Sequence, residues 1–150
     1  MDCVFCKIVK EELESVSVWE DEEHIALLDL YPNTKGMVVL ITKKHYDSYA
    51  FDIPDKAYDD LMIASKTVAR IMEKGLKVQR VSMVMEGMGV NHAHIKLYPM
   101  HGLEDKFHEM LAKDRVFFKK YPGYITTQMG TQVDIKELKK LAKEIKSANE

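Results

Sequence analysis

Residues 92–99, which read HAHIKLYP, place three polar side chains at every second position of a mostly apolar segment. Side chains of a β-strand point alternately to its two faces, so His92, His94 and Lys96 are predicted to line one face while the residues between them face a core. Neighbours in this row would stand about 6.6 Å apart, because a strand rises ~3.3 Å per residue. A phosphate group lying along the row would therefore be within reach of more than one of them.

The two imidazoles of this row have three chemical interpretations. They can ligate a metal ion, since neutral imidazole binds zinc readily. One of them can act as a nucleophile or as a general acid or base near neutral pH. Alternatively, they lie on an exposed sheet face and do no chemistry. The loop of Gly87 and Gly89 just before them and the ammonium of Lys96 just after them favour a binding site for an anion.

A second pair of residues with metal-binding chemistry, Cys3 and Cys6, opens the chain. The C-x-x-C spacing suits two thiolates that hold one metal ion from a tight turn. Two further interpretations are a pair of half-buried thiols and a redox pair. A redox motif normally follows a strand and opens a helix in a βαβ unit, and a position this close to residue 1 does not fit that context.

The composition is that of one globular domain with a core of its own. The chain has 150 residues, of which 46% are hydrophobic and 31% charged, and this excludes a disordered protein. A formal net charge of −2 gives no global attraction to nucleic acid or to an acidic membrane. No apolar run has the length of a signal peptide or a membrane-spanning helix, so we expect a soluble cytoplasmic protein with no membrane partner.

The spacing of apolar residues predicts an α+β fold, not alternating βαβ units. Three strands with short connections form an antiparallel meander, a long amphipathic helix follows, and the HAHIKLYP segment belongs to a later strand. A final lysine-rich helix is capped by Asp134. In order, the expected strands are 16–19, 24–29, 37–41, 81–85, 90–98 and 124–128, and the expected helices are 54–75, 103–113 and the segment after Asp134.

The segment 92–99, together with several blocks before it, resembles the histidine triad (HIT) family of nucleotide hydrolases and transferases. The family signature is His-φ-His-φ-His-φ-φ, often followed by proline, on a strand after a glycine-containing loop, and residues 92–99 match it with lysine at the third histidine. Several other blocks match in order and spacing, and the resemblance extends to about His101. These blocks are CVFC at 3–6, WEDE at 19–22, LD at 28–29, PNTKG at 32–36 and His45.

The resemblance implies a two-step covalent mechanism. His94, the middle residue of the signature, would attack the α-phosphate of a nucleotide ester, anhydride or phosphoramidate and form a nucleotidyl-histidine. Water or another acceptor would then take the nucleotide. Such a nucleophile needs an unprotonated ring nitrogen that is held in one tautomer by a hydrogen bond at the other nitrogen. Asp29 matches the carboxylate that binds the ribose hydroxyls, although a residue at a strand end can also be a plain turn residue.

The resemblance to the bacterial branch that begins with C-x-x-C implies a structural zinc ion. Its ligands would be Cys3, Cys6, His45 and His92. A closed Cys₂His₂ set is chemically a structural site and not a Lewis acid at the phosphate. His92 would then face the metal, which leaves His94 and Lys96 for the substrate.

The chain departs from the family pattern at two places that touch the phosphate. Lys96 replaces the third histidine, a position that holds glutamine in the related transferase branch, so a phosphate-contacting role is expected. Its ammonium would stabilise charge on the phosphoryl oxygens and lower the pKa of His94. The usual Gly-Gln-Ser run is absent, and we expect Gly87, Gly89 or Asn91 to supply the polar contacts instead.

These inferences define a prediction for the whole chain. Residues 1–102 form a HIT-like core, a five-stranded antiparallel sheet with one long helix, and residues 103–150 are a C-terminal extension packed on the same domain. Family resemblance implies a homodimer that binds a purine nucleotide or nucleotide conjugate. A nucleotide-binding protein without turnover is the main alternative. A zinc-dependent interaction module for nucleic acid is disfavoured by the net charge.

Overall fold

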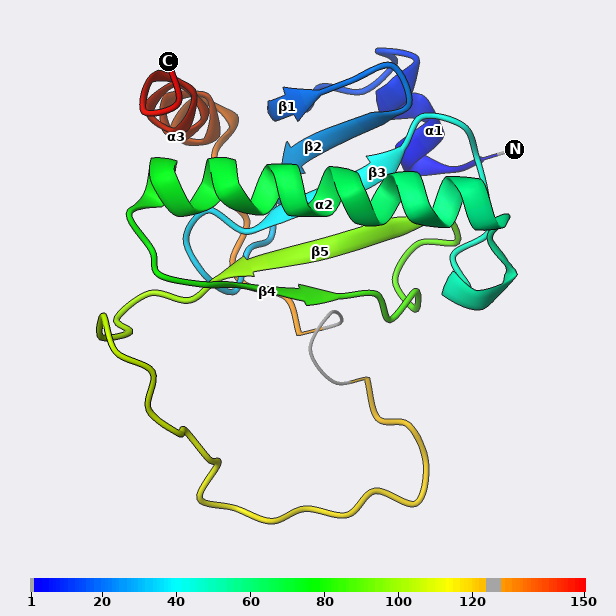
Figure 1. The fold of residues 1–150 in the computed structure, drawn as a ribbon. Helices are drawn as coiled ribbons and strands as arrows, with labels where there is room; N and C mark the ends of the chain where they lie inside the picture. Colours follow the sequence, from blue (N-terminus) through cyan, green and yellow to red (C-terminus); the bar gives the residue numbers. More distant parts are fainter. Residues whose placement is uncertain (1, 124–127) are drawn as a thin grey trace.

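A single antiparallel sheet carries the HAHIKLYP segment on an inner strand. The computed structural model describes residues 2–123 and 128–150. The strand order is β1-β2-β3-β5-β4, and every neighbouring pair is antiparallel (Figure 1). The α+β class and the five-stranded antiparallel sheet are therefore confirmed. The strands are Ser17–Glu20 (β1), His24–Leu28 (β2), Val38–Thr42 (β3), Val81–Val84 (β4) and His94–Pro99 (β5).

The register of the inner strands sorts their side chains onto two faces. Ile41 pairs with His94 and Val39 with Lys96, so these side chains belong to one face of the sheet. Leu27 pairs with Val39 and lies on that face as well. The alternating residues form the main core on the other face, and they include Ala26, Leu28, Val38, Leu40, Ile95 and Leu97. The predicted alternation of the HAHIKLYP segment is thus confirmed from His94 onward.

The long helix α2, Asp55–Leu76, covers the main core face, as expected from its apolar stripe (Figure 1). Pro54 precedes its first residue, where a missing N–H is tolerated, and Lys77 ends it in the left-handed conformation with φ of 55°. Its buried residues repeat at spacings of three and four and are Leu61, Ala64, Ser65, Val68 and Met72.

A short helix, α1, covers the opposite face beside His94. It spans Val4–Val9 and lies behind the sheet when α2 is in front (Figure 1). Its apolar residues Phe5, Ile8 and Val9 pack on Leu27 and Ile41, which form a second, smaller core cluster with Val39. The segment that contains the C-x-x-C motif therefore covers the face of the sheet that carries His94.

The C-terminal helix α3, Ile135–Ser147, packs against α2. The Asp134 side chain accepts a hydrogen bond of 2.7 Å from the Lys136 backbone N–H, which confirms the predicted cap. Gly75 on α2 permits the close approach, because a Cβ at this position would stand 2.8 Å from the Ile145 backbone. Buried Leu138, Ala142 and Ile145 belong to the main core. None of the described helices is long and apolar enough to span a bilayer.

Two sequence predictions differ from the structure. The helix expected over 103–113 is wrong: this segment is irregular and almost entirely exposed, and its apolar residues Phe107, Met110 and Leu111 are not buried in the core that would stabilise a helix. The last strand begins at His94 rather than at residue 90, since residues 91–92 form a bend. The short strand expected over 124–128 falls almost wholly outside the described residues. Segment 128–133 contacts the turn after β2, where the Gly130 N–H donates to the Tyr31 carbonyl oxygen at 3.0 Å.

Candidate active site and metal centre

Four predicted ligands from three distant parts of the chain meet at the entrance to β5. The ligand atoms of Cys3, Cys6, His45 and His92 all lie within 4.8 Å of one another. The Nδ1 atom of His92 is 3.4 Å from the Cys3 Sγ atom and 3.6 Å from the Cys6 Sγ atom. His45 Nδ1 is 3.3 Å from Cys6 Sγ and 3.2 Å from His92 Nδ1.

These separations have the dimensions of a tetrahedral metal site. Bond lengths of about 2.1 Å to nitrogen and about 2.3 Å to sulfur place nitrogen ~3.6 Å from sulfur and the two nitrogens ~3.4 Å apart. Burial raises the pKa of the Cys6 thiol and neighbouring Cys3 adds to the effect, so ionising both thiols calls for a positive charge between them. The four residues present can therefore hold a metal ion.

A hydrogen bond at His92 and a carboxylate near His45 lie on the far side of each imidazole from the ligand cluster. His92 Nε2 donates to the backbone carbonyl oxygen of Thr42 at 2.7 Å, which leaves the Nδ1 lone pair for the cluster. His45 Nε2 lies 3.6 Å from the Asp47 carboxylate. Burial also lowers the pKa of His92 and keeps its ring neutral. Both rings therefore present Nδ1 as a ligand atom.

His94 uses its nitrogens in the opposite way. Its Nδ1 lies 2.6 Å from the His92 carbonyl oxygen, which can only accept, so Nδ1 carries the proton and Nε2 the lone pair. No partner of Nε2 occurs among the described residues, and every fully buried side-chain nitrogen there has one, so a ligand can reach Nε2. Burial lowers the pKa of His94, and the Lys96 ammonium acts in the same direction.

Lys96 and Asp29 face each other beside His94. The Lys96 Nζ atom lies 3.6 Å from Asp29 Oδ2, and their side chains are only 15% and 13% exposed. The other Asp29 oxygen, Oδ1, accepts from the Tyr31 backbone N–H at 2.7 Å. The strand-end position of Asp29 therefore combines a turn role with a carboxylate aimed at the row of polar residues on β5.

A largely apolar cavity of about 450 Å³ joins His94, Lys96 and Asp29. Its size and its few polar groups are typical of a site for a small organic ligand that carries charge at one end. Helix α1, the inner strands and the segment before α3 all contribute to the wall. The lining residues are Val4, Phe5, Ile8, Glu14, Ser15, Val16, Leu27, Leu28, Asp29, Leu30, Tyr31, Val39, Gly89, Val90, His94, Lys96, Met129 and Leu138.

A family profile described as the HIT domain matches residues 10–103 of the chain, which is more than half of its length. The chain belongs to the HIT family. An uncharacterised HIT-like protein of Methanocaldococcus jannaschii is 31% identical over 101 residues, which cover 65% of this chain and 78% of that protein. The adenosine 5'-monophosphoramidase of Saccharomyces cerevisiae is 33% identical over 98 residues, 65% of this chain and 61% of that enzyme.

The crystal structure of a histidine triad nucleotide-binding protein, described as hypothetical, from Sulfolobus tokodaii has the same fold. It superposes with a TM-score of 0.75 at 23% identity, over 97% of this chain and 91% of that one. The predicted membership of the HIT family is therefore confirmed by sequence, and its fold by structure.

Of the three residues predicted to contact phosphate in the loop before the HIT signature, only one lines the cavity. Gly89 lines the cavity, whereas Gly87 and Asn91 face the segment after His45. Ser48 Oγ donates to the Gly87 carbonyl oxygen at 2.7 Å, and the Ser48 backbone N–H donates to Asn91 Oδ1 at 3.0 Å. Asn91 Nδ2 donates to Asp47 at 2.9 Å. In this HIT chain the loop is therefore hydrogen-bonded to the segment that follows His45.

Phe5 is a site residue that sequence reasoning missed. Its ring centroid lies 5.7 Å from the His92 ring and 5.4 Å from the His94 ring, edge-on to both. It therefore touches the ligand cluster and also forms part of the cavity wall. Its position between two cysteines of the HIT chain is the available signal, since residues inside a metal-binding turn are held close to the other ligands.

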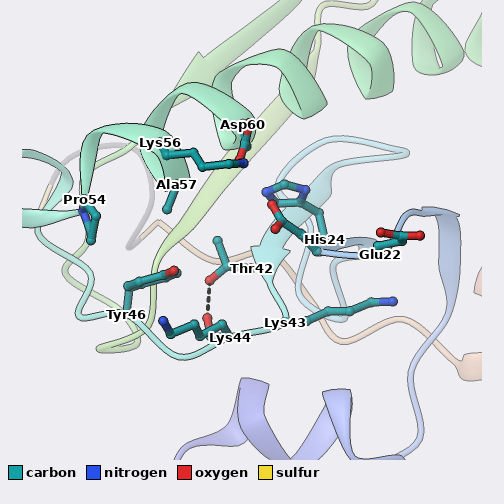
Figure 2. Close-up of a pocket in the computed structure, with 11 residues that line it drawn as sticks. Glu22, His24, Thr42, Lys43, Lys44, Tyr46, Pro54, Lys56, Ala57 and Asp60 are labelled. Atoms are coloured by element: carbon teal, nitrogen blue, oxygen red, sulfur yellow. Dashed lines mark hydrogen bonds and ion pairs between the residues drawn. The ribbon is translucent and has the colours of Figure 1, made fainter.

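A second cavity, about 230 Å³, lies on the α2 side of the sheet and contains none of the predicted site residues (Figure 2). It opens between the start of α2 and the ends of β2 and β3. Two of its three lysines pair with carboxylates, Lys56 with Asp60 and Lys43 with Glu20, and the third, Lys44, lies over the Tyr46 ring at 5.0 Å. This cavity is therefore separate from the predicted site of the HIT chain.

Proposed function

We propose that this HIT protein is a nucleotide hydrolase or transferase that cleaves the α-phosphate bond of a nucleoside 5'-phosphoryl compound. The observation that carries the proposal is the state of His94. Its Nδ1 atom is fixed by a backbone carbonyl, and its Nε2 lone pair is accessible in a cavity that also contains a lysine and an aspartate. That combination supports nucleophilic attack on an anionic phosphorus.

The proposed reaction has two balanced steps. His94 Nε2 forms a bond to the α-phosphorus while the bond from that phosphorus to the leaving oxygen or nitrogen breaks, and the leaving group takes the electron pair and a proton. A water or another acceptor then attacks the phosphorus of the nucleotidyl-histidine, gives up its proton and displaces Nε2. The backbone carbonyl of His92 holds the ring in the required tautomer through both steps.

Lys96 and Asp29 are proposed to separate when the substrate enters. Lys96 would turn to the phosphoryl oxygens, where charge develops, and Asp29 would accept hydrogen bonds from the ribose hydroxyls. The Gly89 backbone is proposed to approach the phosphate, since this residue lines the cavity. Gly87 and Asn91 were predicted for the same role, and in the structure their polar groups serve the contacts to Ser48. The apolar remainder of the wall suits a purine base.

One relative supports the proposed substrate class. The yeast adenosine 5'-monophosphoramidase is 33% identical, so a nucleoside phosphoramidate is the first substrate to test, and a dinucleoside polyphosphate is the second. Conjugates of a purine nucleotide share the α-phosphate that His94 would attack.

Zinc is the proposed occupant of the four-residue cluster. Cys3, Cys6, His45 and His92 would hold it, and the bound ion would supply structural cross-linking of α1 to β5. A homodimer, from family resemblance, and a cytoplasmic location complete the proposal.

An adduct-trapping experiment tests the function. The protein is exposed briefly to adenosine 5'-phosphoimidazolide, and intact mass and peptide maps are recorded. We expect a gain of one AMP moiety on His94, absent in His94→Ala and retained in His108→Ala, which alters an exposed histidine outside the cavity. Calorimetric AMP binding without any adduct or product would instead identify a nucleotide-binding protein without turnover, for which the Lys96–Asp29 pair is the favouring observation.

A further inference from the structure

Residues 108–122, here called the arm, stand away from the rest of the molecule. Figure 1 shows this yellow segment projecting beyond the edge strand β4. All of its residues are exposed, including Met110, Leu111, Val116 and Phe117, whose exposed fractions reach 86% at Phe117. Apolar side chains gathered on an exposed segment mark an interaction surface. The arm therefore has the composition of a binding element.

The arm is also cationic. It carries Lys113, Arg115, Lys119 and Lys120 against only two acidic residues. Among the described residues none of these four cations forms an ion pair, although eight ion pairs occur elsewhere in that part of the chain. Within residues 2–123 and 128–150, these four cations thus have no ion-pair partner.

A surface with the opposite properties lies at the start of α2. In this acidic patch, Tyr49 and Phe51 are 59% and 79% exposed, and their rings contact each other at 5.6 Å. The exposed residues Asp52, Asp55 and Asp59 follow closely in the sequence and form no ion pair within the described part of the chain. The patch presents aromatic rings framed by negative charge, which complements the apolar and positive arm.

The arm and the acidic patch do not meet within one chain. In Figure 1 the arm hangs beyond β4 and does not fold back on the 3₁₀ helix Ala50–Asp52. The residues just before the arm contact the segment that precedes β4. The Arg80 guanidinium lies 5.0 Å from the centroid of the Phe107 ring, and Gln79 Nε2 donates a hydrogen bond of 3.0 Å to the Asp105 carboxylate. We propose that the arm of one copy docks on the acidic patch of a second copy, so that a symmetric dimer makes the contact twice.

This geometry is within reach of the arm. Fifteen extended residues span at most ~50 Å, and a loop that doubles back covers about half of that, which is comparable to the radius of a small domain. In a two-fold dimer, an arm that reaches the partner's patch makes the same contact in both directions. The inference deepens the homodimer proposed above by naming its contact surface, and it does not depend on the chemistry of His94.

Charge reversal and re-pairing test the contact. One variant reverses the arm (Arg115→Glu, Lys119→Glu, Lys120→Glu) and the other reverses the patch (Asp52→Lys, Asp55→Lys, Asp59→Lys). Sedimentation velocity of the full chain measures self-association, with circular dichroism to verify folding. We expect each variant alone to dissociate with a Kd about 100-fold higher or more, because like charges then face each other twice. An equimolar mixture is expected to form a heterodimer, in which both contacts are again between opposite charges.

A matched control separates this contact from a general charge effect. Reversing Lys136, Lys140 and Lys143 on the exposed side of α3 changes the net charge by the same amount as the arm variant, and should leave the Kd within about twofold. A dimer that persists in the arm variant, or a mixture that does not associate, overturns this interface but leaves a homodimer through another surface.

A monomeric wild-type protein overturns both the interface and the proposed homodimer. Arm-dependent flotation of that monomer with phosphatidylserine vesicles would assign the arm to a lipid surface instead. Adduct formation at His94 is measured separately and is unaffected by either result.

Discussion

His92 and His94 lie two residues apart and yet present opposite nitrogens to their surroundings. His92 donates through Nε2 to the Thr42 carbonyl and turns Nδ1 to the cysteines, whereas His94 donates through Nδ1 to the His92 carbonyl and leaves Nε2 for the cavity. Both rings are buried and both have lowered pKa values. The role of each imidazole is therefore set by which backbone carbonyl its other nitrogen meets, and not by burial or charge.

The largest difference between the two histidines should be seen when the His94 imidazole is removed. His94→Ala should lower AMP release from adenosine phosphoramidate by about 10³-fold or more, since no other neutral imidazole lines the cavity among the described residues. Steady-state kinetics measure the effect, and the melting temperature should change little because the lost ring borders an open cavity. Undiminished release in this variant would contradict the nucleophile assignment.

Removing the metal should destabilise the fold around His92, which belongs to the ligand cluster. Protein purified without chelator is expected to contain one zinc per chain. Stripping it should lower the free energy of unfolding by about 4 kcal/mol at a free zinc concentration of 1,000 times Kd, because the ion binds only the folded cluster. Denaturant melts with elemental analysis measure this. Cys6→Ser serves as a three-ligand comparison, and metal-free protein of unchanged stability would refute the four-ligand site.

Lys96 should matter for rate more than for folding. Lys96→Met removes the charge beside His94 and leaves the partly buried Asp29 unpaired, so kcat should fall about 100-fold. Lys96→Gln is the matched control, because a neutral donor at this position can still contact phosphate, and it should retain most of the rate. Equal losses in the two variants would show that the cationic charge, and not hydrogen bonding, is required.

The smallest expected effect is at Phe5, which touches both histidines. Phe5→Ala removes part of the cavity wall and should raise KM about tenfold, with kcat within about twofold, since the lost contact is apolar. Phe5→Leu should restore most of the affinity. A fall in kcat with unchanged KM would mean that the ring instead holds His94 in its reactive orientation.

Local patterns predicted the elements that have a packing partner nearby. The meander, the long helix α2 and the Asp134 cap follow from alternation, from three-and-four spacing and from capping chemistry, and all three are confirmed. The helix expected over 103–113 failed although its apolar spacing is helical, because periodicity describes a face but does not supply the surface that the face must cover.

The candidate site divides in the same way. Spacing singled out the cysteine pair, the family resemblance implied the four-residue ligand cluster, and the fold brings its members together. The sequence contains no sign of the carbonyls of Thr42 and His92, which select the tautomers, because main-chain groups are the same in every residue and only the strand register places them. The closeness of Asp29 to Lys96 likewise depends on how three strands pair.

The ring of Phe5 connects the cavity to the ligand cluster, so a metal in the cluster could report on binding in the cavity. It stands edge-on to one imidazole of the ligand cluster and to the imidazole that lines the cavity. Cobalt(II) accepts tetrahedral sulfur and nitrogen ligands as zinc does, and its visible absorption responds to small changes in ligand geometry. A ligand that pushes on Phe5 would therefore shift the colour of the cobalt protein, so filling of the cavity could be followed without any label on the nucleotide.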